Sequence, residues 1–151
     1  MNVPLLDLQA QYVSLRDDLQ QAVDRVMSSQ RFVLGEEVRR LETSLADYCQ
    51  TKYAVGCASG SDALLLALMA LDVKAGDEVI TSSFSFFATG ACVARLGARP
   101  VFVDIDPDTF NISPQAATSV VTEKTKAIIP VDLFGQLAPI DAIAAARLTT
   151  C

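Results

Sequence analysis

From residue 53 onward, short apolar runs alternate with segments of helical character, and this alternation constrains the fold more than any other sequence feature. The apolar runs are "YAVGCA" (53–58), "DEVITSSF" (77–84), "RPVFVDID" (99–106) and "KAIIPVDLFG" (126–135), and the helical segments cover residues 62–71, 86–96, 114–121 and 139–147. Strands and helices alternating at this spacing form right-handed crossovers between parallel strands. Because the runs are almost continuously apolar, we expect an α/β fold, three-layer, with a mainly parallel sheet and helices on both faces.

Two amphipathic helices precede this alternation. Apolar side chains recur at helical spacing over residues 12–27 and again over 38–48, with charged residues on the opposite side. Glu36 and Glu37 stand in the first turn of the second segment, where the helix dipole favours acidic residues. We therefore expect an N-terminal helical segment over 1–52 and an α/β domain over 53–151.

Charge and composition exclude several classes of partner. The net charge is -6 and the 12 Lys and Arg residues are scattered, so we expect no nucleic acid and no membrane as partners. The longest uncharged apolar run, 63–71, is less than half of the roughly 20 residues that a spanning helix needs. The N-terminus lacks the basic and small-residue signals of a secretory leader, so we expect a cytoplasmic protein. With no His and no C-x-x-C pair, no metal site is expected, and the four cysteines are interpreted as buried thiols.

The stretch "AVGCASGSDALLLAL" places small polar residues between an expected strand and an expected helix. Free backbone N–H groups and the positive end of the helix dipole would face the strand-end crevice, which suits a phosphate. The stretch is neither a Walker loop nor a dinucleotide fingerprint, because the required glycine and lysine spacing is missing. An ordinary capped turn, with Ser61 or Asp62 as the N-cap, is the alternative interpretation.

Other candidate residues follow the remaining strands, because ligands bind at the carboxyl ends of parallel strands. The aromatic residues of "SFSFFATG" (83–90) either pack in the core or stack on a planar cofactor ring. Asp104 and Asp106 follow the third apolar run. Asp132 is either a ligand contact or a cap for a neighbouring turn, and Pro130 is expected to end the pairing of its strand early.

Taken together, these motifs resemble the N-terminal part of the DegT/DnrJ/StrS family of sugar aminotransferases, which are fold type I pyridoxal-phosphate enzymes. The stretches that carry the resemblance are "VPLLDLQAQY", "FVLGEEVRRLE", "VGCASGSDALLLAL", "GDEVITSSFSFFAT", "GARPVFVDIDPDTFNI" and "TKAIIPVDLFGQ". They follow the family order and spacing up to about residue 146. The domain over 53–151 is accordingly expected to be an incomplete cofactor-binding α/β domain.

The resemblance implies a reaction, a cofactor and three binding residues. The family converts a keto-sugar nucleotide to an amino-sugar nucleotide, with glutamate as the usual amino donor and pyridoxal 5'-phosphate as cofactor. By similarity, Gly60 and Ser61 hold the cofactor phosphate, and Phe86 stacks on the pyridine ring. The family usually has Thr at position 61, and Ser retains the hydroxyl. Family members are usually homodimers, so a homodimer is expected for the complete protein.

The resemblance also implies that the catalytic groups are missing from this sequence. The family's Asp that pairs with the pyridine nitrogen, and the lysine that attaches the cofactor, both come after residue 151. Lys52, Lys74, Lys124 and Lys126 all precede expected strands, opposite the crevice, so no catalytic residue is expected here. The chain is interpreted as a truncated aminotransferase. The alternative is a non-catalytic module that at most binds phosphate or dimerises, and a nucleotide-sugar oxidoreductase is disfavoured by the missing glycine fingerprint.

Overall fold

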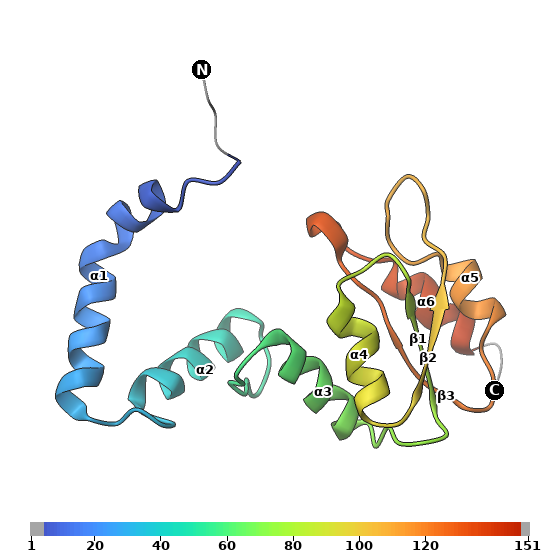
Figure 1. Ribbon diagram of the computed structural model, residues 1–151, viewed down its shortest axis with the longest axis horizontal. Coiled ribbons are helices and arrows are strands. Elements are labelled where there is room, and N and C mark those ends of the chain that lie inside the picture. Colours follow the sequence, from blue (N-terminus) through green and yellow to red (C-terminus); the bar gives the residue numbers. More distant parts are fainter. Residues whose placement is uncertain (1–4, 149–151) are drawn as a thin grey trace. The chain divides into compact units, whose positions relative to one another are not determined.

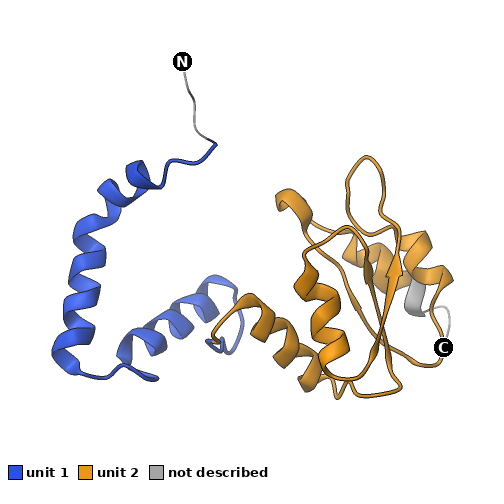
Figure 2. Cartoon of the chain, viewed as in Figure 1, with its two compact units in different colours: residues 1–56 blue, residues 57–151 orange. Residues whose placement is uncertain are grey.

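The computed structural model describes residues 5–148 and divides into two compact units, residues 1–56 and 57–151 (Figure 2). The smaller unit holds two helices, α1 (Leu8–Ser29) and α2 (Glu36–Tyr48). The elements of the larger unit are α3 (Gly60–Ala70), β1 (Glu78–Ser82), α4 (Phe87–Arg95), β2 (Arg99–Val103), α5 (Pro114–Ser119), β3 (Thr125–Ile129), the 3-10 helix η1 (Leu133–Gly135) and α6 (Ile140–Leu148) (Figure 1). The boundary expected after residue 52 stays a prediction.

The three strands form one parallel sheet in the order β2-β1-β3, with β1 in the centre. Every residue of β1 is buried, and Val79 and Ile80 have no exposed surface. Because successive strand residues point to opposite faces, these two neighbours enter different cores. Val79 packs in a cluster with residues of α3 and α4, and Ile80 packs in a second cluster with residues of α5 and α6. The three-layer arrangement with helices on both faces is thereby confirmed.

The helices of the smaller unit are joined by an ion pair. Arg25 of α1 donates from Nε to Oε1 of Glu37 in α2 over 2.8 Å. Glu36 and Glu37 occupy the first turn of α2, as the sequence predicts. No residue of α1 is buried, and its apolar stripe, including Leu15 and Leu19, stays exposed. None of the helices among residues 5–148 is long and apolar enough to cross a bilayer.

The strand expected over residues 53–58 is not present. In the described part of the chain this segment pairs with none of the three strands, and Tyr53 and Val55 are 73% and 80% exposed. A strand exists only where a neighbour completes its backbone hydrogen bonds. An apolar run indicates that a segment is suited to burial, but it does not identify the strand that must lie beside it.

The cysteine interpretation is correct for Cys92 alone among the described thiols. Cys92 is buried on α4, whereas Cys49 and Cys57 are exposed and all three are unpaired. Cys49 caps the end of α2 and Cys57 lies in the turn before α3, so neither is on a core-facing position of an element. Cys151 lies outside the described residues.

A buried carboxylate organises the amino end of the sheet. The side chain of Glu78, at the start of β1, is only 7% exposed. Its Oε1 accepts from Nη2 of Arg99 at the start of β2, and its Oε2 accepts from the Thr122 hydroxyl over 2.8 Å, just before β3. One side chain therefore ties together the beginnings of all three strands. The Arg99 guanidinium, and then the Thr122 hydroxyl, hold the pKa of Glu78 below its usual value.

The lowered pKa predicts an acid-dependent loss of stability that is specific to Glu78. A carboxylate with a depressed folded-state pKa stabilises the fold fully above its unfolded pKa, and the contribution is lost as pH falls through the folded pKa. Glu78→Gln should therefore lower the urea midpoint at pH 7. The difference in urea midpoint between the variant and the unsubstituted protein should become smaller as the pH is lowered toward 3. Urea unfolding followed by circular dichroism at several pH values measures both curves. Parallel curves would refute a role for the ionised form.

Candidate functional site

The start of α3 has the geometry of a capped helix N-terminus. Ser59 is extended (φ -161°, ψ 165°), and its Oγ accepts from the Asp62 amide over 3.1 Å. The same hydroxyl donates to Oδ2 of Asp62 over 3.0 Å, and the first helical bond runs from Ala63 N to Ser59 O. The N-cap is therefore Ser59, and the expectation of Ser61 or Asp62 is wrong. The reason is that the Asp62 carboxylate reaches back to Ser59, which places Asp62 in the third helical position.

The two predicted phosphate-binding residues occupy the first two positions of this helix. Within the described chain, the amides of Gly60 and Ser61 donate to no protein acceptor, as the geometry of a helix N-terminus requires. The space beside Gly60 is open, since a Cβ built there meets no atom within 4 Å. Two free donors, the helix dipole and open space are features that favour an anion at a helix start.

Phe86 lies at the start of the neighbouring helix, α4, which packs against α3. The buried Cys92 of α4 donates from Sγ to the carbonyl of Ser61 over 3.2 Å, so the first turn of α3 is anchored to α4. Phe86 precedes Cys92 by six residues, which corresponds to about 9 Å along a helix axis. The structure thus brings Ser61 and Phe86 into the same part of the larger unit. Phe86 is the N-cap residue of α4 and is 78% exposed.

The aromatic residues after β1 are not core residues. Phe84, Phe86 and Phe87 are 48%, 78% and 83% exposed. Phe86 and Phe87 line a cavity of about 600 Å³ between α4 and the edge strand β2, a size within the usual range of ligand pockets. Gly90 lies beside it and leaves room for the ring of Phe102, which would lie 2.8 Å from a Cβ at this position. The core-packing alternative for these aromatics is therefore wrong.

The three candidate aspartates at the other strand ends have local structural partners. Asp106 Oδ1 accepts from the amides of Thr109 and Asp108 and from the Thr109 hydroxyl, and these bonds lower its pKa. Asp104 Oδ1 accepts from the Ile105 amide. Asp132 Oδ1 accepts from the Ala138 amide over 2.8 Å, so this oxygen bridges the loop after β3. As expected, β3 ends directly before Pro130.

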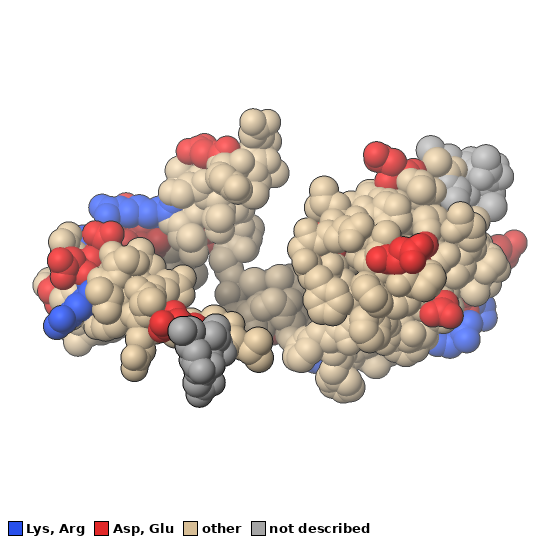
Figure 3. All heavy atoms as spheres, turned by 90° about the horizontal axis from the view of Figure 1, so that it is seen from above, with Lys and Arg blue, Asp and Glu red and all other residues tan. Residues whose placement is uncertain are grey.

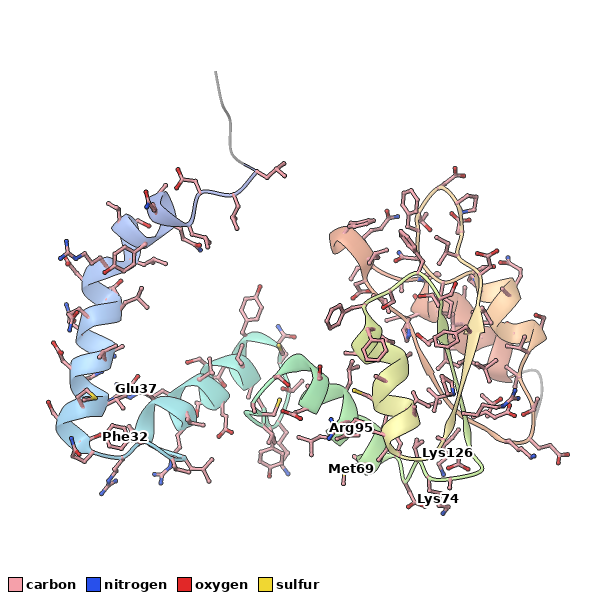
Figure 4. The ribbon with its side chains drawn as sticks, viewed as in Figure 1. Phe32, Glu37, Met69, Lys74, Arg95 and Lys126 are labelled. Atoms are coloured by element: carbon pink, nitrogen blue, oxygen red, sulfur yellow. The ribbon has the colours of Figure 1, made fainter. Side chains whose placement is uncertain are left out.

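The lysines of the larger unit lie at the amino end of its sheet. Lys74 precedes β1, Lys124 precedes β3, and Lys126 is the second residue of β3. Figure 4 shows Lys74 and Lys126 at the end opposite the loops that leave the strands. Lys74 pairs with Asp72 over 2.8 Å, which raises its pKa. Lys52 belongs to the smaller unit.

At the carboxyl end of the sheet, the sequence did not single out Asn111, which lies in the loop after β2. It is 1% exposed, and its Nδ2 donates to the carbonyls of Gln136 (3.2 Å) and Leu137 (2.9 Å). Its Oδ1 accepts from the Leu133 amide over 3.4 Å. The loop after β2 is thereby bonded to the loop after β3. In the sequence, Asn111 stands within "DPDTFNISP", where Asn is an ordinary turn residue. No local pattern indicates that its hydrogen-bond partners are Gln136 and Leu137, 25 and 26 residues away.

Known proteins are similar to this chain over almost its whole length. A pleiotropic regulatory protein from Geobacillus stearothermophilus is 56% identical over 145 residues, which cover 96% of this chain and 39% of that protein. A UDP-2-acetamido-2-deoxy-3-oxo-D-glucuronate aminotransferase from Pseudomonas aeruginosa is 48% identical, over 93% of this chain and 39% of that protein. The chain spans about two fifths of the length of these curated relatives.

Solved structures define the class. DesV of S. venezuelae, in complex with a ketimine intermediate, has a TM-score of 0.94 and 40% sequence identity, covering 98% of this chain and 40% of that chain. The layered arrangement of sheet and helices is that of a fold type I aminotransferase. More particularly, the chain belongs to the DegT/DnrJ/EryC1/StrS aminotransferase family, whose model matches residues 13–148. Proteins of this family use pyridoxal phosphate.

The assignment of the N-cap predicts unequal effects of two serine substitutions. Ser59→Ala should destabilise the larger unit by about 1 kcal/mol, because the capping bond to the Asp62 amide is lost. Ser61→Ala is the matched control and should change stability little, because none of the described hydrogen bonds uses its hydroxyl. Urea unfolding of the three proteins measures the difference. A larger loss for Ser61→Ala would contradict the assignment.

Proposed function

We propose that this chain supplies the cofactor-binding part of an aminotransferase that converts a keto-sugar nucleotide to an amino-sugar nucleotide. The observation that carries the proposal is the pair of unpartnered amides at Gly60 and Ser61, at a helix start that is open to solvent. The relatives support the reaction, because several of them are named as transaminases of nucleotide-linked sugars. Glutamate is the proposed amino donor.

Three residues would hold the cofactor. The amides of Gly60 and Ser61 would donate to the phosphate of pyridoxal 5'-phosphate, and the Ser61 hydroxyl would add a third donor. The exposed ring of Phe86 would stack on the pyridine ring. When bound, the cofactor supplies an electron sink for transfer of the amino group. The residues named here would bind and orient the cofactor.

No residue of this chain is proposed as the catalyst. Lys74 and Lys126 stand at the amino end of the sheet, and a strand of typical length separates that end from the start of α4 by about 15 to 20 Å. This placement also favours the second candidate, a non-catalytic module that binds phosphate or dimerises. Transamination of a keto-sugar nucleotide by the purified 151-residue chain would exclude the second candidate.

The proposal extends to the setting of the complete protein. We propose a cytoplasmic location, and a homodimer because the family resemblance implies one. The exposed apolar stripe of α1 is compatible with burial against other protein surface in that assembly.

Replacing Gly60 tests the phosphate site without disturbing the helix. Proline is favoured at the first helical position and removes only the N–H, and Ser59 before it is already extended. Gly60→Pro should weaken binding of pyridoxal 5'-phosphate by about tenfold or more, since a hydrogen bond to a charged group contributes about 1.5–3 kcal/mol. Titration calorimetry measures the affinity.

Gly60→Ala is the matched control, because it keeps the N–H and its Cβ meets no atom within 4 Å. Pyridoxal without its phosphate provides a second control, and its affinity should be the same in all three proteins. Equal pyridoxal 5'-phosphate affinity in the Pro and Ala variants would refute the phosphate site at α3.

Substitution of Phe86 separates ring binding from phosphate binding. Phe86→Ala should weaken binding of pyridoxal 5'-phosphate by about two- to tenfold, because aromatic stacking contributes about 0.5–1.5 kcal/mol beyond area burial. Its affinity for inorganic phosphate should not change. If both ligands lose affinity equally, Phe86 supports the fold of the site and does not stack on the ring.

A further inference from the structure

Three phenylalanines from three different loops meet at the carboxyl ends of the strands. Phe84 follows β1, Phe110 lies in the loop after β2, and Phe134 lies in η1 after β3. The ring centroids of Phe84 and Phe110 are 6.1 Å apart, as are those of Phe110 and Phe134, with interplanar angles of 38° and 81°. The rings remain 48%, 43% and 80% exposed, so their contacts do not bury them in a core. We call this set the phenylalanine row.

The backbone holds the phenylalanine row in place at a local cost. Phe110 and Phe134 have φ values of 59° and 57°, in the left-handed region that is unfavourable for a bulky side chain. The Phe110 amide donates to the Asp106 carbonyl over 2.9 Å. Through its bonds to the carbonyls of Gln136 and Leu137, the buried Asn111 joins the loops that carry Phe110 and Phe134. The rings are therefore preorganised before any ligand arrives.

The charge of these loops selects the kind of ligand. Residues 83–86, 104–113 and 130–138 contain Asp104, Asp106, Asp108 and Asp132 and no Lys or Arg. Figure 3, which looks down on this end of the larger unit, shows acidic side chains within an uncharged surface and basic ones only toward its margin. Carboxylates repel phosphates and other carboxylates. A nucleotide diphosphate and glutamate are therefore disfavoured at the phenylalanine row, and an uncharged or cationic ligand is favoured.

A sugar ring matches this combination of aromatic faces and carboxylates. The C–H groups on one face of a pyranose carry partial positive charge and pack on the electron-rich faces of aromatic rings. Its hydroxyls donate to carboxylates in charge-assisted hydrogen bonds. Asp104 and Asp132 each use only Oδ1 in a described hydrogen bond, which leaves Oδ2 as an acceptor. An amino group on the sugar would gain further from the aromatic faces, as other ammonium groups do.

We propose that the phenylalanine row is the subsite for the sugar ring of the substrate and of the amino-sugar product. The identity of this ligand rests on the proposed function, whereas the surface itself is made of residues other than the α3 amides proposed to bind phosphate. Phe84 precedes Phe86 by two residues, so the row begins beside the residue assigned to the cofactor ring. A sugar held on the row would thus lie next to the group that must react with it.

Titration of the isotope-labelled 151-residue chain with methyl glucoside and with glucosamine tests the subsite. Both sugars should shift backbone amide signals of the loops that carry Phe84, Phe110 and Phe134 at millimolar concentration, glucosamine more tightly. Glucuronate should bind more weakly than methyl glucoside, because its carboxylate faces the acidic loops. Absence of shifts at these loops, or tightest binding of glucuronate, would overturn the proposal.

Variants of Phe134 distinguish a loss of stacking on the sugar ring from a loss of folding. Phe134→Ala should weaken glucosamine binding by about two- to tenfold, and Phe134→Trp should retain it. Tyr48→Ala, which removes an equally exposed aromatic ring in α2, is the matched control and should have no effect. Unchanged affinity in Phe134→Ala would refute the proposal, as would a concentration-dependent dimer that disappears in this variant without any sugar binding.

Failure of the sugar subsite can be distinguished from failure of the proposed phosphate site. Gly60→Pro should leave glucosamine binding unchanged, because the N–H that it removes lies at the start of α3 and not in the phenylalanine row. If sugar binding persists while Gly60→Pro and Gly60→Ala bind pyridoxal 5'-phosphate equally, the phosphate site fails and the sugar subsite stands. If the Gly60 variants behave as predicted but no sugar binds, the sugar subsite alone fails.

Discussion

Burial of the central strand β1 is the constraint on which the rest of the larger unit depends. Hydrogen bonds to β2 and β3 satisfy both edges of this strand, and helices cover both of its faces. Val79 packs with residues of α3 and α4 on one face of the sheet, and Ile80 packs with residues of α5 and α6 on the other. Complete burial of adjacent residues leaves the chain no alternative to a three-layer arrangement.

Parallel pairing around β1 also determines where chemistry can occur. All three strands end at the same edge, so the loops that carry Phe84, Phe110 and Phe134 converge there. The opposite edge is occupied by structural charge, with Glu78 bonded to Arg99 and Thr122. The two edges thus separate a stabilising polar cluster from an exposed surface of aromatic and acidic side chains. The lysines of the larger unit lie with the stabilising cluster, which is why none of them is assigned to catalysis.

Much of the fold could be predicted from the sequence because its signals are local. Apolar periodicity placed α1, α2 and the four later helices within a few residues of their observed bounds, and Pro130 marked the end of β3. Residues 53–58 show the limit of such signals, because their apolar character predicted a strand that lacks a neighbour among the described residues. The N-cap was misplaced by two or three residues because Ser59, Ser61 and Asp62 all have suitable side chains, and only the bond between Ser59 and Asp62 distinguishes them.

By itself, the sequence determined the α/β class, the parallel sheet and a helix that begins near Gly60 and Ser61. Each of these depends on residues that are close together in the chain, through periodicity, capping and turn chemistry. Only the tertiary structure decided that the aromatics after β1 are exposed, that Asp132 bridges the loop after β3, and that Asn111 joins two loops. The phenylalanine row likewise exists only in three dimensions. Successive members are 26 and 24 residues apart in the chain. Contacts over such separations are made by the packing of the sheet and its helices, which no local pattern encodes.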